Sequence, residues 1–233
     1  FPRSRNIRQL NFYYKYFILI REWLKDSQTE IPEYIDESIY NFGSAYSLIC
    51  ENFKHGLLFN GNNETKNDNF NNYLSRFGYK FKNDNQEIGG YSIQKNKNIL
   101  LVMDVGPSPE KKFSKDYQSG ALSFEIISNE NKVICNSGYF QNPKHKLNEL
   151  SKSTAIHSTL IIDNNSSCKL AKIANNNSVI EKGLKILKKS SVFEKNYWNV
   201  TASHNGYFKK YGIIHERKIE FFPEKNKFIG IDI

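Results

Sequence analysis

The sequence predicts an α+β fold class, with an N-terminal helical hairpin followed by an antiparallel β-sandwich. Two observations support this prediction. Up to about residue 53, apolar residues recur at intervals of three and four, as on one face of a helix. After Gly89–Gly90, short apolar runs alternate with turns rich in asparagine, as in antiparallel sheets. Because 39% of the 233 residues are hydrophobic, the chain can bury a core of this kind.

The helical part is expected to hold two helices. The first covers residues 7–24, and its apolar face consists of Ile7, Leu10, Tyr14, Phe17, Ile18 and Leu24. The second begins near Pro32, a residue suited to the first turn of a helix, and its apolar stripe runs from Ile35 to Phe53. Since residues 26–30 form a short connection, the two helices should pack as an antiparallel hairpin. Asn60–Gly61 is a strong turn signal that ends this part.

The remainder is predicted to be a linker and a sandwich. We divide the chain into residues 1–60 (helices), 61–88 (a linker with one short helix) and 89–233 (the sandwich). The expected strands are YSIQKN, NILLVMDV, GALSFEIIS, KVICNSG, HSTLIID and YWNVTAS. Asn205–Gly206 should form a hairpin turn. The last residues, KFIGIDI, read as an interrupted strand, so we expect a sandwich truncated at its C-terminus in a piece of a longer protein.

Composition excludes several functional classes. The net charge of +9 favours a polyanionic partner. The lysines are dispersed among asparagines, however, and there is no zinc-finger spacing, RNP motif or basic helix, so nucleic acid is the weaker prediction. No apolar run approaches the roughly 20 residues of a membrane span. Cys50, Cys135 and Cys168 match no metal or redox spacing and are expected to be small hydrophobic residues. Hydrolase elbows, phosphate loops and dinucleotide fingerprints are also missing.

Five motifs carry more specific information. They are MDVGPSP, ALSFE, VICNSGY, STAIHSTL and VTASHNGYFKKYGIIHERKI. In this order and spacing, they resemble the C-terminal β-sandwich of the heparinase II/III-like family of polysaccharide lyases. PRSRN and HGLLFNG, nearer the start of the chain, are similar to the last helices of that family's α/α toroid domain. The resemblance implies that the helical hairpin is the end of such a toroid and that the protein works in the periplasm or cell envelope.

The activity that the resemblance implies is β-elimination on an acidic polysaccharide that contains uronic acid. This reaction must neutralise the sugar carboxylate, remove the C5 proton and protonate the departing C4 oxygen. His157, His204 and Tyr207 are the catalytic candidates. Each also has a purely structural interpretation: His157 as a hydrogen-bonded histidine beside the sheet, His204 as a cap of the hairpin turn, and Tyr207 as a ring packed on the sheet. Most of the toroid would precede Phe1, so the catalytic centre would be incomplete.

Four residues are candidates for binding the substrate. Arg5 and Asn6 keep an Arg-Asn pair of the family before the first helix, Gln118 occupies a family histidine position, and Arg217 could bind a sugar carboxylate bidentately. The alternatives are that Arg5 is an incidental charge of a helix-entry loop and that Arg217 lies on a solvated strand face.

The family's metal site is predicted to be lost. Its His, Asp and His ligand positions fall on Gln118, Asn136 and His157, and amides bind zinc poorly. We therefore expect no cofactor, neither zinc nor calcium, and expect these three side chains to share hydrogen bonds. The same two amides suggest a rival hypothesis, a non-enzymatic glycan-binding or cell-envelope protein on this fold. Nothing in the sequence indicates an oligomeric state.

Overall fold

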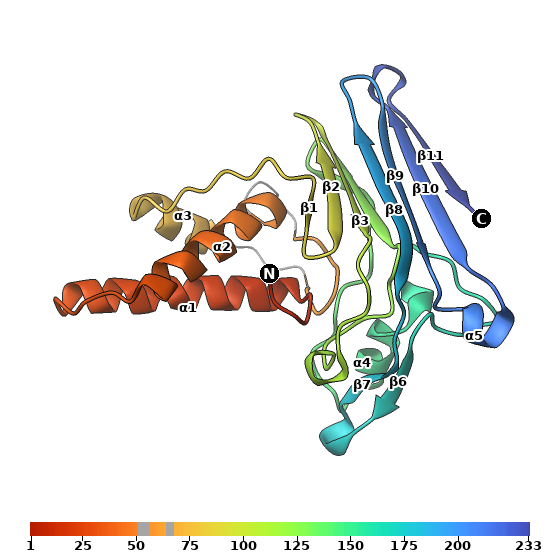
Figure 1. Cartoon of the computed structure of the whole chain (residues 1–233), viewed down its shortest axis with the longest axis horizontal. Helices are drawn as coiled ribbons and strands as arrows, with labels where there is room; N and C mark the ends of the chain where they lie inside the picture. Colours follow the sequence, from red (N-terminus) through yellow and green to blue (C-terminus); the bar gives the residue numbers. More distant parts are fainter. Residues whose placement is uncertain (51–55, 64–67) are drawn as a thin grey trace.

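The protein is built in layers, with helices on one side of two facing β-sheets (Figure 1). The computed structural model describes residues 1–50, 56–63 and 68–233. The order is helices first and antiparallel strands afterwards, so the predicted α+β class is confirmed. None of the helices in the described ranges is both long enough and apolar enough to traverse a bilayer.

The helices follow the predicted periodicity. They are α1 (Ile7–Asp26), α2 (Glu33–Ile49) and α3 (Asp68–Arg76). The Asn6 side chain caps α1 by accepting the backbone N–H of Gln9, which satisfies one of the free donors of the first turn. The rings of Tyr14 and Tyr46 lie 5.3 Å apart where α1 and α2 pack together, so the predicted hairpin is confirmed. Phe53, the last residue of the expected stripe, lies outside the described residues.

The first sheet is an antiparallel meander with the order β1-β2-β3-β4-β5 in the described residues. Its strands are β1 (Glu87–Ile88), β2 (Tyr91–Lys95), β3 (Ile99–Asp104), β4 (Phe124–Ser128) and β5 (Asn131–Ile134). Four of the predicted strand runs are found here. A short 3-10 helix, η1 (Lys111–Phe113), lies in the long connection between β3 and β4.

The second sheet has the order β11-β10-β9-β8 and is also antiparallel. Its strands are β8 (Ile186–Phe193), β9 (Trp198–His204), β10 (His215–Phe222) and β11 (Lys227–Asp232). Between the sheets in sequence lie α4 (Lys146–Ser151) and a separate β6 (Lys169–Lys172) and β7 (Ser178–Lys182) pair.

Two predictions of local structure are wrong. HSTLIID is not a strand: Thr154–Ile156 forms a 3-10 turn, and the residues after it form a loop. The side chain of Ser158 bonds both the N–H and the C=O of Phe124, and such side-chain bonds replace a strand ladder. Asn205–Gly206 is not a hairpin turn either, because α5 (Phe208–Tyr211) extends the connection between β9 and β10.

The first sheet is buried on both faces, which explains its nearly continuous apolar strands. Along β3, alternate residues face opposite cores. Leu100 and Val102 pack in the cluster that contains α1 and α2, whereas Leu101 and Met103 pack against Trp198 and the rest of the second sheet. The sheet therefore joins the helices to the sandwich.

Replacement of Leu101 by alanine should lower the free energy of unfolding by about 2–5 kcal/mol, because it opens a cavity between the sheets. The Leu101 side chain is fully buried. Urea denaturation would measure the change. Val133→Ala is the matched control, since Val133 is 63% exposed on β5 and should change stability by less than about 0.5 kcal/mol. Equal effects of the two substitutions would contradict the described packing.

Candidate functional site

The helical part meets the first sheet at a contact that we call the seam. It joins residues 5–8, at the start of α1, to Asp104 at the end of β3, to residues 116–118 after η1, and to Tyr139. Five of the predicted site or metal-position residues lie at or beside it, namely Arg5, Asn6, Gln118, Asn136 and His157. The contacts of these five side chains decide what they can do.

Arg5 is a buried crosslink between the helices and the sheet. Its Nε donates to Gly89 O at 3.0 Å, and its terminal nitrogens donate to the carbonyls of Gly90, Gly106 and Pro107. The fifth N–H donates to the Asp104 carboxylate at 2.5 Å. Burial alone would lower the pKa of Arg5, but the charge and hydrogen bond of Asp104 together with Tyr91 and Tyr117 outweigh it and the pKa is raised, so the guanidinium stays charged.

Glycine makes this crosslink possible. A Cβ on Gly106 would lie 2.4 Å from Arg5 Cζ, and a Cβ on Gly90 would lie 2.9 Å from Arg5 Nε. Gly90 also has a φ of +81°, which side chains with a Cβ rarely adopt. Because all five donors of Arg5 are used inside the protein, the geometry contradicts the prediction that Arg5 binds a sugar carboxylate.

Asn6 and Gln118 are also engaged in the structure. Asn6 caps α1 with its oxygen and donates through Nδ2 to Asp116 at 3.3 Å. Gln118 accepts the N–H of Gly61 at 3.0 Å and donates to the carbonyls of Gly138 and Ser151. Both side chains are almost fully buried. Their hydrogen bonds hold neighbouring loops in place, and neither side chain faces a ligand.

The three predicted metal positions lie close together but do not offer metal ligands. Asn136 Nδ2 donates to Glu125, and its Oδ1 accepts from Ser158 N at 3.1 Å and lies 3.3 Å from His157 Nδ1. The amide oxygen and nitrogen of Gln118 are both engaged in hydrogen bonds within the protein. A divalent metal would find one histidine lone pair here, which does not fit zinc or calcium. Within the described ranges, no group of three or more His, Cys, Asp or Glu side chains could hold a metal.

His157 is neutral at physiological pH. Burial lowers its pKa to about 4, against a smaller opposite effect of the Ser151 carbonyl. Since Asn136 Oδ1 is an acceptor, Nδ1 carries the hydrogen and Nε2 holds the lone pair. That Nε2 is buried and has no hydrogen-bond partner among the described residues. The side chain of His157 is also only 8% exposed.

The remaining candidates form a second group, at the end of the four-stranded sheet. Arg217 donates to both oxygens of Asp232, at 2.7 and 2.8 Å, and also to the carbonyls of Leu122 and Ser158. Tyr207 donates to Leu160 O at 2.8 Å. These bonds hold residues 157–160, the loop that carries His157. Arg217 is 7% exposed, which contradicts the alternative of a solvated strand face.

His204 caps a turn and begins a chain of buried imidazoles. Its Nδ1 accepts the N–H of Gly206 at 3.0 Å, and its Nε2 lies 3.2 Å from Nδ1 of His215. The Nε2 of His215 lies 2.7 Å from Asp232 Oδ1. Burial lowers the pKa of His204 to about 3, with smaller contributions from the charges of His215 and Arg217. His204 and Tyr207 are each 1% exposed.

The cluster of Arg8, Asp116 and Tyr139 at the seam was missed in the sequence. Arg8 donates to Asp116 at 3.1 Å, and its side chain is 34% exposed. Tyr139 donates to the other Asp116 oxygen at 3.0 Å and accepts from Asn148 at 3.1 Å. Burial, followed by the Asp116 charge, raises the pKa of Tyr139 to about 12. The residue types alone carry no signal of this cluster, because Arg8 lies more than a hundred residues from its other members.

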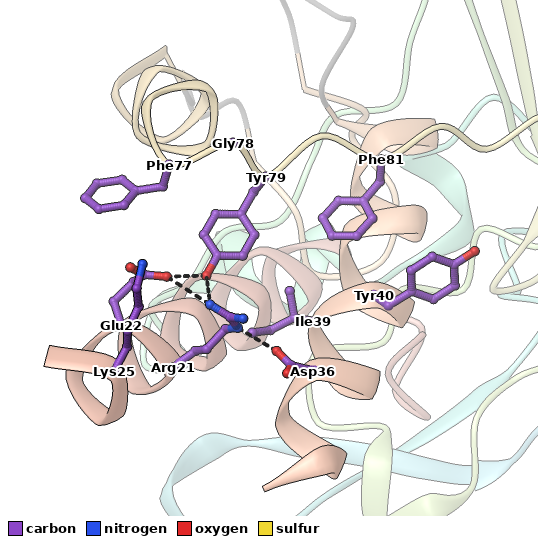
Figure 2. A pocket seen from close by; sticks show the side chains of 10 residues that line it. All are labelled: Arg21, Glu22, Lys25, Asp36, Ile39, Tyr40, Phe77, Gly78, Tyr79 and Phe81. Atoms are coloured by element: carbon purple, nitrogen blue, oxygen red, sulfur yellow. Dashed lines mark hydrogen bonds and ion pairs between the residues drawn. The ribbon is translucent and has the colours of Figure 1, made fainter. Parts of the chain in front are cut away.

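One groove adjoins this arrangement, and a separate pocket lies farther along the helices. A groove of about 300 Å³ shares Tyr139 with the seam and is lined by Leu58, Gly138, Phe140, Leu147 and Leu150 among others. A pocket of about 410 Å³ lies on the helices, where Arg21 donates to Asp36 and Tyr79, and Tyr79 donates to Glu22 (Figure 2). At 1.5 Å per residue, Arg21 lies roughly 20 Å along α1 from Arg8. Its charged groups bind one another, and none of the predicted site residues lines it.

Comparison with known proteins places the chain in a family. Residues 85–233 match the family described as Heparinase II/III-like, C-terminal. The chain belongs to this heparinase II/III-like family. The resemblance predicted from the motifs is therefore confirmed, and the chain is related to polysaccharide lyases. No curated protein matches the sequence.

Solved structures of this family have the same fold. Heparan sulfate lyase HepC from Pedobacter heparinus superposes with a TM-score of 0.68 at 17% identity, over 98% of this chain and 37% of that one. A crystal structure of heparinase III gives a TM-score of 0.66 at 15% identity, over 99% of this chain and 39% of that one. The chain thus spans well under half the length of the family members to which it is similar.

Replacement of Arg5 by alanine should destabilise the protein by about 3–5 kcal/mol, because Asp104 would remain buried without a counter-charge. Urea denaturation would measure this loss. Arg8→Ala is the control: its ion pair with Asp116 is partly exposed and should be worth about 1 kcal/mol or less. Wild-type stability of the Arg5 variant would show that Arg5 is not the crosslink described.

Acidification should destabilise the fold through its buried histidines. The folded pKa of His157, about 4, lies below the usual value of about 6.5. Its contribution to stability is therefore complete above pH 6.5 and is lost as pH falls toward 4, by up to about 1.4 kcal/mol per pH unit. Burial raises the pKa of Glu125, which acts in the opposite direction. Denaturation curves of wild type and His157→Gln between pH 7 and 4 isolate the histidine, since the variant should have the shallower pH dependence.

Proposed function

We propose that the whole protein containing this chain acts on an acidic polysaccharide by β-elimination at a uronic acid, with the sugar chain lying along the seam. The family match over residues 85–233 carries this proposal. A periplasmic or cell-envelope location is part of the same proposal, because it rests on the same resemblance.

The seam offers groups suited to part of the chemistry. Arg8 is partly exposed, and a guanidinium can bind a carboxylate through two parallel hydrogen bonds. Tyr139 keeps its proton at neutral pH, but it is buried and its O–H donates to Asp116, so in this proposal it helps to position Asp116 and Arg8. Asp116, which is bonded to both, fixes their positions. In this proposal, Arg8 replaces the predicted Arg5 as the group that contacts sugar.

In this proposal, the group that removes the sugar C5 proton is not among the residues that the structure describes. None of the histidines found at the seam in residues 1–50, 56–63 and 68–233 is exposed, since His157 is buried. We therefore give His157, His204, Tyr207 and Arg217 positioning roles, because together they hold the loop of residues 157–160. No step passes through a metal, because the Gln118 and Asn136 amides are occupied.

A second candidate is a glycan-binding or cell-envelope protein that has lost catalysis. The observation in its favour is that Gln118 and Asn136, at the family's ligand positions, are fully engaged in hydrogen bonds within the protein. Such bonds stabilise the loops equally well in a protein that binds glycan without cleaving it.

Replacement of Arg8 by alanine in the whole protein should lower kcat/KM on the cleaved glycan about tenfold to a hundredfold, the cost of one charged hydrogen bond. The measurement is the ultraviolet absorbance of the unsaturated uronate formed from heparan sulfate or polyuronates. Arg76→Ala, which removes an exposed charge from α3, is the control and should be neutral. Saturable glycan binding without a rise in absorbance favours the second candidate. If the protein neither binds nor cleaves acidic glycans, both candidate functions are overturned.

A further inference from the structure

The connection between β3 and β4 presents a positively charged surface beside the seam. Lys111, Lys112 and Lys115 are exposed around η1. Arg3, from the segment before α1, places its Cζ 5.8 Å from the centre of the Phe113 ring, and Lys112 Nζ lies 5.0 Å from the same centre. We call these five residues the η1 patch. Two cations from distant parts of the sequence thus lie beside one half-exposed ring.

The backbone under the η1 patch is held in place from three sides. Arg5 donates to Pro107 O at 3.0 Å, at the start of the connection. The Oγ of Ser114 accepts the N–H of Ile180, in β7, at 2.8 Å. Lys152, which is only 2% exposed, donates to Lys115 O at 2.6 Å. A fixed backbone reduces the ordering cost of binding, so the patch is pre-organised for a ligand.

The positive charge of the patch is poorly compensated. Lys112 pairs with Glu110 at 3.5 Å, but both side chains are more than 60% exposed, and such pairs contribute little. Neither Arg3 nor Lys115 forms an ion pair with any residue in the described ranges. Lys111 is partly balanced by Glu181 in β7, whose pKa it helps to lower after Lys169 and Lys182, so the uncompensated charge belongs mainly to Arg3 and Lys115. Clustered like charges repel, and an anionic ligand would relieve that repulsion.

We propose that the η1 patch is a subsite for an anionic sugar residue, next to the one at the seam. This subsite proposal rests on the proposed function and extends it. The Phe113 ring would pack against the apolar face of a sugar, while Arg3 binds a carboxylate or sulfate and the lysines bind further anionic groups. Lys115 immediately precedes Asp116, which binds Arg8 and Tyr139. One extended glycan would therefore contact the seam and the patch with neighbouring sugar units.

The test compares variants of the whole protein in binding a size-defined heparan sulfate oligosaccharide. Combined replacement of Arg3 and Lys112 by alanine should weaken binding at least about tenfold at 0.1 M salt, and should reduce the slope of log affinity against log salt by about two, by the counterion release known from other polyanions. Phe113→Leu keeps an apolar side chain and should weaken binding severalfold. Replacement of Lys225 and Lys227 by alanine is the charge-matched control, at the β10–β11 turn on the far end of the sandwich (Figure 1). It should change affinity less than about threefold.

Each outcome separates the two proposals. Unchanged affinity of the Arg3/Lys112 variant, alongside normal binding by the wild type, overturns the subsite and leaves the proposed function standing. A wild type that neither binds nor cleaves acidic glycans overturns the proposed function as well. Single-stranded DNA of equal charge is the competitor: if it binds more tightly than the glycan and depends on the same two residues, the patch binds nucleic acid and the sugar assignment fails. Circular dichroism of every variant confirms folding.

Discussion

The buried ion pair between Arg5 and Asp104 is the constraint on which the rest of the structure depends. A guanidinium removed from water must have all its hydrogens accepted, and here the acceptors come from the ends of β1 and β3. Meeting that demand brings the start of α1 against the sheet and leaves room only for glycine at positions 90 and 106. The seam, with Arg8 and Asp116 at its surface, exists because this pair fixes the two layers relative to each other.

A second set of hydrogen bonds joins the two sheets of the sandwich. The segment of residues 157–160 crosses between the sheets without joining either ladder, and its carbonyls accept from Arg217 in β10 and from Tyr207 in the β9–β10 connection. Asn136 holds its other side through Ser158 and His157. In a sequence motif, these polar residues would suggest a catalytic role. In the structure, they form hydrogen bonds with buried backbone groups of a segment that has no regular secondary structure. Their conversion to apolar residues would leave several of those groups without partners.

Sequence reasoning succeeded where a local signal determines structure and was wrong where distant contacts do. The spacing from Ile7 to Leu24 defines α1, and apolar runs define β3 and β9, because burial follows periodicity. β8 was missed, since nearly all of it is exposed and its centre, residues 188–191, is polar or charged. The loop after Thr154 resembles a strand in composition, yet its serine and threonine side chains bond the backbone. The pairing of Arg8 with Asp116 spans 108 residues and follows no local pattern.

The imidazole pair at the end of the second sheet has one further consequence. Because the amide of Gly206 points at Nδ1 of His204, the hydrogen of that ring must sit on Nε2, which in turn places the hydrogen of His215 on its own Nε2, facing Asp232. Every link in the chain therefore has a defined polarity, from a main-chain amide in a turn to a carboxylate on the outermost strand. The backbone N–H of Gly206 thus fixes the tautomers of both His204 and His215. Neither imidazole can change its tautomer unless the other changes too.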